Sequence, residues 1–65
     1  MIKYPDINVQ LSTEDGNAYS IMARVTTAMR RAGIPKQKQE EYQKEASAGD
    51  YDNLIQVTMR WVEVA

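Results

Sequence analysis

Cysteine and histidine are both absent from this sequence of 65 residues. Without cysteine the chain forms no disulfides and offers no thiolate metal ligands. Without either residue, structural zinc, catalytic zinc and haem lack their usual ligands, and the nucleophile–base pairs of Ser or Cys with His cannot form. We therefore expect no metal, no cofactor and no enzymatic activity.

The sequence also lacks a strong net charge and a long apolar run. Eight basic residues against nine acidic ones leave a net charge of −1, which is not typical of a protein whose whole surface binds nucleic acid. No apolar run is long enough to cross a bilayer, and residues 1–5 lack the apolar stretch of a signal peptide. We expect a cytoplasmic protein that makes no membrane contact.

What is present suits a compact globule. Hydrophobic residues make up 43% of the chain, with one Trp and four Tyr, unlike a disordered tail. The length predicts a single domain over residues 1–65, near the lower limit at which a chain buries enough apolar surface to fold alone. Helix packing and self-association are the ways left to stabilise such a domain.

Apolar and polar residues alternate over residues 7–12. This is the period of a half-buried strand, with Ile7, Val9 and Leu11 facing inward. Pro5 disfavours helix at the residue before it, so residues 1–6 are expected to form an N-terminal arm. Residues 13–17 have the composition of a turn.

A helix is expected over residues 18–32, because the apolar positions return to one side of a 3.6-residue period. These positions are Ala18, Ile21, Met22, Val25, Ala28, Met29 and Ala32. Asn17 is a good N-cap, and Gly33 stands where a helix commonly ends in the left-handed conformation. Pro35 prevents the helix from continuing.

A second helix is expected over residues 36–48, which are rich in Gln, Glu, Lys and Ala. Its apolar face is thin, essentially Tyr42 and Ala46, so it should be a surface helix. Gly49 ends it.

Residues 51–61 are ambiguous. A helix is consistent with the spacing of Tyr51, Leu54, Ile55, Thr58, Met59 and Val62, but residues 55–61 also alternate as a strand does. Helix is favoured because the N-cap candidate Asp50 follows a glycine stop directly. Residues 62–64 are then a short strand that pairs with residues 7–12. The predicted fold class is α+β: one N-terminal strand followed by three helices, with a short C-terminal strand beside the first.

Four short segments carry a resemblance that covers most of the chain from about Ile7. They are Asp-Gly-Asn-Ala at 15–18, Arg-Arg-Ala-Gly at 30–33, Gly-Asp-Tyr-Asp-Asn-Leu at 49–54 and Met-Arg-Trp-Val at 59–62. In these segments the chain resembles a group of small uncharacterised bacterial and phage proteins. The resemblance implies a self-contained bacterial or phage accessory protein and supports helix after residue 50. It assigns no functional residue, because no activity is established for that group.

Charge is segregated along the chain. Between Asp15 and Glu40 every charged residue is basic: Arg24, Arg30, Arg31, Lys36 and Lys38. Arg24 and Arg31 share a helical stripe with Thr27, and forked guanidinium donors on such a stripe suit phosphates. The alternative is that these cations complement the helix dipole or pair with the acidic residues that follow, at 40–52.

Asp50 and Asp52 suggest a calcium loop at first glance, but the further oxygen ligands and terminal Glu of an EF-hand do not follow. An N-cap at Asp50 and a first-turn acid at Asp52 explain both residues more simply.

The large apolar residues are expected mainly in the core: Tyr19, Met22, Met29, Tyr51 and Trp61. Trp61 is an exception, because it lies to one side of the apolar stripe expected for the helix over residues 51–61. We interpret it as partly exposed and, next to Arg60, as an anchor for a protein partner or a second subunit.

Two functions remain. We favour a small non-catalytic module that binds an unidentified protein partner or has a structural role. The alternative is a nucleic-acid-binding accessory protein that uses the basic stretch 24–38. The alternative is weaker because the net charge is slightly negative and no aromatic residue lies in that stretch to stack on bases. A strand with so few neighbours also leaves an open edge, so homodimerisation through such edges is expected.

Overall fold

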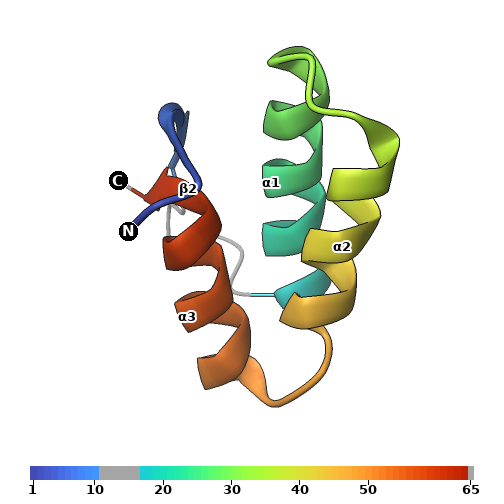
Figure 1. Ribbon diagram of the computed structural model, residues 1–65. Coiled ribbons are helices and arrows are strands. Elements are labelled where there is room, and N and C mark those ends of the chain that lie inside the picture. The colour runs from blue at the N-terminus through green and yellow to red at the C-terminus, as the bar shows by residue number, and fades with distance from the viewer. Residues whose placement is uncertain (11–16, 65) are drawn as a thin grey trace.

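The computed structural model describes residues 1–10 and 17–64 of the chain. In chain order its elements are β1 (Tyr4–Val9), α1 (Ala18–Arg31), α2 (Lys36–Ala46), α3 (Tyr51–Trp61) and β2 (Val62–Val64). The helices lie alongside one another, and the strands lie beyond the end of α3 (Figure 1). The predicted α+β class is confirmed, with three helices between a first strand and a short C-terminal strand that pairs with it.

The two strands form a parallel sheet, in which Tyr4 lies opposite Val62 and Val9 opposite Val64. Parallel neighbours need a long crossover connection, and here the three helices supply it. The register shifts between Tyr4 and Asn8, where β1 holds more residues than β2. Pro5, which has no N–H to donate to a ladder, lies within this bulge.

The predicted bounds of the first strand need correction. The strand begins at Tyr4 and ends at Val9, so the arm expected over residues 1–6 is wrong for residues 4–6. The cause is non-local, because β2 lies beside this segment and the Lys3 N–H donates to the Arg60 carbonyl oxygen at 2.9 Å. Ile7 and Val9 face the core as predicted. Leu11 and the turn expected at 13–16 lie outside the described residues.

Both ends of α1 follow local sequence signals. The Asn17 side chain accepts a hydrogen bond from the Tyr19 N–H at 2.8 Å, which confirms the predicted N-cap. At the other end Gly33 has a φ of 83°. The Gly33 N–H donates to the Arg30 carbonyl and the Ile34 N–H to the Met29 carbonyl, which together make a Schellman motif. The helix itself ends at Arg31, one residue before the predicted end.

The helix α2 is the predicted surface helix. Its buried residues are Tyr42 and Ala46, the thin apolar face expected from the sequence. It ends at Ala46 rather than at 48. The Ser47 hydroxyl donates to the Gln43 carbonyl oxygen at 2.7 Å and so satisfies an acceptor of the last turn.

Residues 51–61 are helix, as predicted, and the Asp50 side chain caps it by accepting from the Asn53 N–H at 2.9 Å. The predicted inward positions are confirmed for Leu54, Thr58 and Val62, which are buried, and wrong for Tyr51 and Met59, which are exposed. The buried residues of α3 are Leu54, Val57, Thr58 and Trp61. Their spacing is also helical, so the helix is rotated by about one position from the predicted orientation.

The core lies between the three helices and the inner face of the sheet. Its buried apolar residues are Ile7, Val9, Ile21, Val25, Met29, Tyr42, Ala46, Leu54, Val57, Trp61 and Val62. Over the described part of the chain, no helix combines the length and hydropathy needed to cross a membrane.

Candidate functional site

The predicted protein anchor, Trp61, lies in the core. Its side chain is 1% exposed, so the interpretation that it is partly exposed is wrong. The ring packs edge-on against Tyr42, with centroids 5.8 Å apart, and at a tilt against Tyr4, with centroids 6.0 Å apart. Lys3 places its ammonium group 4.0 Å from the ring centroid, a cation–π contact. Arg60, its predicted companion, is exposed.

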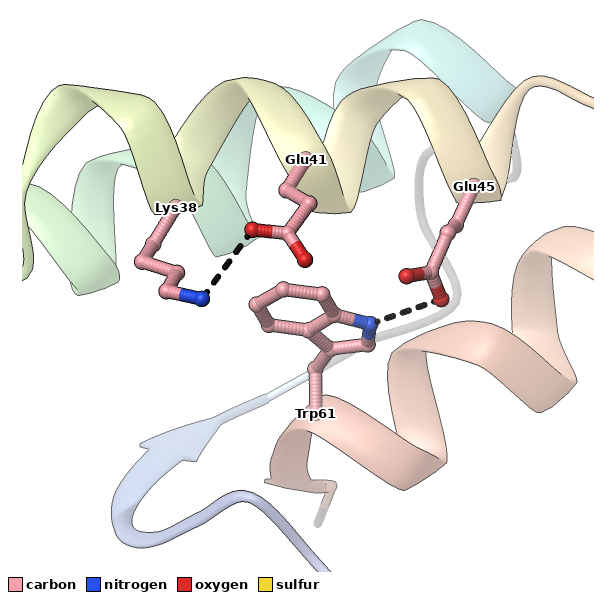
Figure 2. Close-up of polar contacts among 4 residues, drawn as sticks. All are labelled: Lys38, Glu41, Glu45 and Trp61. Carbon is pink, nitrogen blue, oxygen red and sulfur yellow. Dashed lines mark hydrogen bonds and ion pairs between the residues drawn. The ribbon is translucent and has the colours of Figure 1, made fainter.

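The polar end of the indole is bonded within the fold. Trp61 Nε1 donates to Glu45 Oε1 at 3.2 Å, and Figure 2 shows Glu45, Glu41 and Lys38 all projecting from α2 toward the ring. Lys38 Nζ and Glu41 Oε2 form an ion pair at 3.2 Å. A tryptophan that is packed on its faces and bonded at its nitrogen serves the interior of the protein rather than a docking partner.

The five cations of the basic stretch are exposed, but they do not form one surface. Lys38 belongs to the ion pair beside Trp61. Arg30 and Arg31 stand in the last turn of α1, where they complement the helix dipole as the alternative interpretation expected. Within residues 1–10 and 17–64 the arginines of α1 form no ion pair with the acidic residues of α2.

Arg24 and Arg31 do come together, as their spacing predicts. Both line a hollow of about 380 Å³ between α1 and the end of β1, which we call the arginine hollow. Its lining residues are Asn8, Val9, Gln10, Ala23, Arg24, Thr27, Ala28 and Arg31. Arg24 Nη1 donates to the Gln10 carbonyl oxygen at 3.2 Å, which holds this guanidinium beside the strand. Arg30, Lys36 and Lys38 do not line it.

A second surface was not predicted. Tyr19 and Tyr51 are 79% and 48% exposed, although both were expected in the core. Both line a hollow of about 240 Å³, which we call the tyrosine groove. Its lining residues are Ala18, Tyr19, Met22, Ala46, Ser47, Gly49, Asp50, Tyr51 and Leu54. These residues come from the start of α1, the end of α2 and the start of α3, so the groove forms only when the helices pack.

One signal could have placed Tyr19 on the surface. The buried residues of α1 are Ile21, Val25 and Met29, and at 100° per residue Tyr19 lies well away from their stripe. No comparable signal exists for Tyr51, which shares a stripe with other apolar residues of α3.

A titratable group in the interior is Tyr42. Burial raises the pKa of its phenol, and the hydrogen bond with Thr58 partly opposes that rise. Its oxygen lies 2.7 Å from Thr58 Oγ1. Tyr42 does not line the arginine hollow or the tyrosine groove, so this phenol is a structural group.

The acidic residues around position 50 act in capping. Asp50 is the N-cap of α3, and Asp52 lies in its first turn and accepts from Gln56 Nε2 at 3.1 Å. This confirms the simpler interpretation of the two aspartates. Among the residues that the structure describes, no group of three or more acidic side chains is arranged to hold a metal ion.

The structure is that of a small α+β domain whose described surface includes the arginine hollow and the tyrosine groove. Comparison of the chain with protein-family models, with curated proteins and with solved structures finds no match. The resemblance to small bacterial and phage proteins therefore stays a prediction.

Proposed function

We propose that this protein is a small non-catalytic binding module that docks to another protein through the tyrosine groove. The observation that carries the proposal is the exposure of Tyr19 and Tyr51, which both line an apolar hollow. Tyrosine is enriched in the centres of protein interfaces, where it buries a large ring and offers a hydroxyl to a partner. Neither phenol oxygen has a hydrogen-bond partner among the described residues.

The occupant we propose is an apolar side chain carried on a surface segment of the partner. The lining of the groove includes Met22 and Leu54, and a flexible methionine adapts its shape to an inserted group. Backbone carbonyl groups on both sides of that side chain would then accept from the two tyrosine hydroxyls. This arrangement covers the exposed rings and satisfies their polar ends together.

The non-catalytic part of the proposal is supported by the residue types available. The sequence holds neither histidine nor cysteine, the residues that most often serve as base and nucleophile. A cytoplasmic location and a bacterial or phage source remain parts of the same proposal.

Self-association is a further proposed partnership. The sheet of β1 and β2 has two strands, so each strand has one edge with no neighbouring strand among the described residues. Pairing of such edges across a two-fold axis would enlarge a small core. Light scattering at high micromolar concentration tests this idea, and a strictly monomeric mass would contradict it.

The docking proposal is tested by quantitative affinity capture with a matched control. The test variant is Tyr19→Ser with Tyr51→Ser, and the control is Met59→Ser, which removes an exposed apolar side chain that does not line the groove. We expect a partner that the wild type and the control retain and the double variant loses. Its affinity, measured with the purified partner, should fall at least about tenfold in the double variant, as is typical of interface tyrosines. Equal retention by all three proteins would overturn the proposal.

A further inference from the structure

The arginine hollow is basic in a chain whose net charge is −1. Its described lining includes Arg24 and Arg31 and no acidic residue. No described acidic residue forms an ion pair with Arg24 or Arg31, and the described ion pair joins Glu41 to Lys38. The positive charge of the hollow is therefore not neutralised by the described part of the fold.

The two guanidinium groups are arranged to receive more than one oxyanion. They are seven residues apart on α1, which is about 10.5 Å along the axis, and Thr27 stands between them. The Arg24 guanidinium donates one hydrogen bond to the Gln10 carbonyl oxygen, and the Arg31 side chain makes no hydrogen bond or ion pair with a described residue. Most of the forked donors therefore have no partner among the described residues, and such donors suit carboxylate or phosphate oxygens.

Besides α1, the end of β1 and the residue after it contribute to the hollow. Residues 8–10 line it, and β1 pairs with β2 along one edge only in a two-stranded sheet. A segment that lies beside such a strand adopts an extended conformation, as in β-strand addition. Alternate residues of an extended segment point to the same side at about 7 Å intervals, a spacing that long arginine side chains can accommodate.

We propose that the arginine hollow binds an acidic, extended peptide segment of a partner protein, whose carboxylates pair with Arg24 and Arg31. This inference rests on the proposed function only in that the chain docks to a protein, and it uses a surface separate from the tyrosine groove. The positive charge of the hollow favours a partner segment that carries negative charge.

A nucleic-acid strand fits these observations less well. The described lining of the hollow includes no aromatic side chain that could stack on a base. The remaining cations of the basic stretch lie outside it, and Lys38 is already paired. A protein that tracks a phosphate backbone would extend this positive surface further.

The test is an amide NMR titration of the full chain with a short blocked peptide of sequence Gly-Glu-Val-Glu-Val-Glu-Gly. The matched control peptide has Gln in place of each Glu. We expect saturable shifts confined to residues 8–10 and 23–31 with the acidic peptide, which weaken as salt rises. The Gln peptide should leave these resonances unchanged. No shifts with either peptide would overturn the proposal.

Two double variants that each lose two positive charges test whether the acidic peptide binds at the arginine hollow or is attracted by positive charge in general. Arg24→Gln with Arg31→Gln should weaken binding of the acidic peptide by about tenfold or more, because it removes both forked donors. Arg30→Gln with Lys36→Gln removes the same charge outside the hollow, and it should weaken binding less than about twofold, as rim charges do. Equal losses in the two pairs would show non-specific attraction and overturn the site.

Two further measurements distinguish this proposal from nucleic-acid binding at the same residues and from docking at the tyrosine groove. An oligothymidylate that binds the same residues more tightly than the acidic peptide would overturn the peptide assignment in favour of nucleic acid. The Tyr19→Ser, Tyr51→Ser variant should bind the acidic peptide as the wild type does. Because the titration needs no captured partner, failure of the arginine hollow leaves the result for the tyrosine groove unaffected.

Discussion

The phenol oxygen of Tyr42 lies 2.7 Å from the hydroxyl oxygen of Thr58, and both side chains are fully buried. Tyr42 comes from α2 and Thr58 from α3, so this hydrogen bond joins the surface helix to the core. No buried side-chain oxygen or nitrogen of the described residues lacks a partner. Removal of either hydroxyl would therefore leave the other without a hydrogen-bond partner in an apolar interior, which costs stability.

The replacement Thr58→Val tests this pair directly. Valine keeps the shape of the side chain but removes the hydroxyl, so Tyr42 becomes a buried donor without an acceptor. We expect a loss of about 1–3 kcal/mol in the free energy of unfolding, measured by urea denaturation with Trp61 fluorescence. In a Tyr42→Phe background the same change should cost about 1 kcal/mol less. Strictly additive losses would contradict a coupled pair.

The Tyr42 phenol also makes stability depend on alkaline pH. Burial raises its pKa above the ordinary value of 10.0, so the folded chain holds this proton more tightly than the unfolded chain does. The contribution is fully present below pH 10 and is lost as pH rises toward the folded pKa. We expect the unfolding free energy of the wild type to fall above pH 10 more steeply than that of Tyr42→Phe. Parallel pH profiles for the two proteins would contradict this assignment.

The features predicted correctly from the sequence are the local ones. Asn17 and Asp50 cap their helices through contacts two and three residues away, and Gly33 ends α1 within a few residues of its partners. Such contacts depend on nearby residue types, so a single sequence reveals them.

The errors concern contacts between distant segments. The start of β1 depends on β2, which lies at the far end of the chain. For α3 two apolar stripes were compatible with the sequence, and the choice between Trp61 and Met59 as the inward residue depends on packing against α2 and β1. Helical periodicity finds the helix but does not decide between neighbouring stripes of similar apolarity.

The two candidate surfaces also combine features with a local sequence signal and features that depend on distant segments. The shared stripe of Arg24 and Arg31 was predicted, because an interval of seven residues returns to the same side of a helix. The wall that turns this stripe into a hollow is the end of β1, which the spacing within one helix cannot reveal. The tyrosine groove joins three helix ends and has no local signature.

Trp61 gives a test of whether burial or docking explains the residue. Since it is the sole tryptophan and lies in the core, its fluorescence should be blue-shifted and poorly quenched by acrylamide in the native state. Trp61→Ala should cost about 3–5 kcal/mol, enough to unfold much of a domain this small, as circular dichroism would report. A folded Trp61→Ala protein that loses only its partner would instead support the docking interpretation.

Substitution of Gly33 tests whether the loss of stability comes from the left-handed backbone conformation or from a steric clash of the new side chain. Its φ of 83° is in the left-handed region, and a Cβ added there meets nothing within 4 Å. Gly33→Ala should therefore destabilise the protein through the backbone alone, by about 1–2 kcal/mol. Gly33→Asn should cost less, because asparagine tolerates this conformation better than other non-glycine residues. Urea denaturation of the two variants provides the comparison, and an asparagine variant no more stable than the alanine variant would show that the cost has another origin.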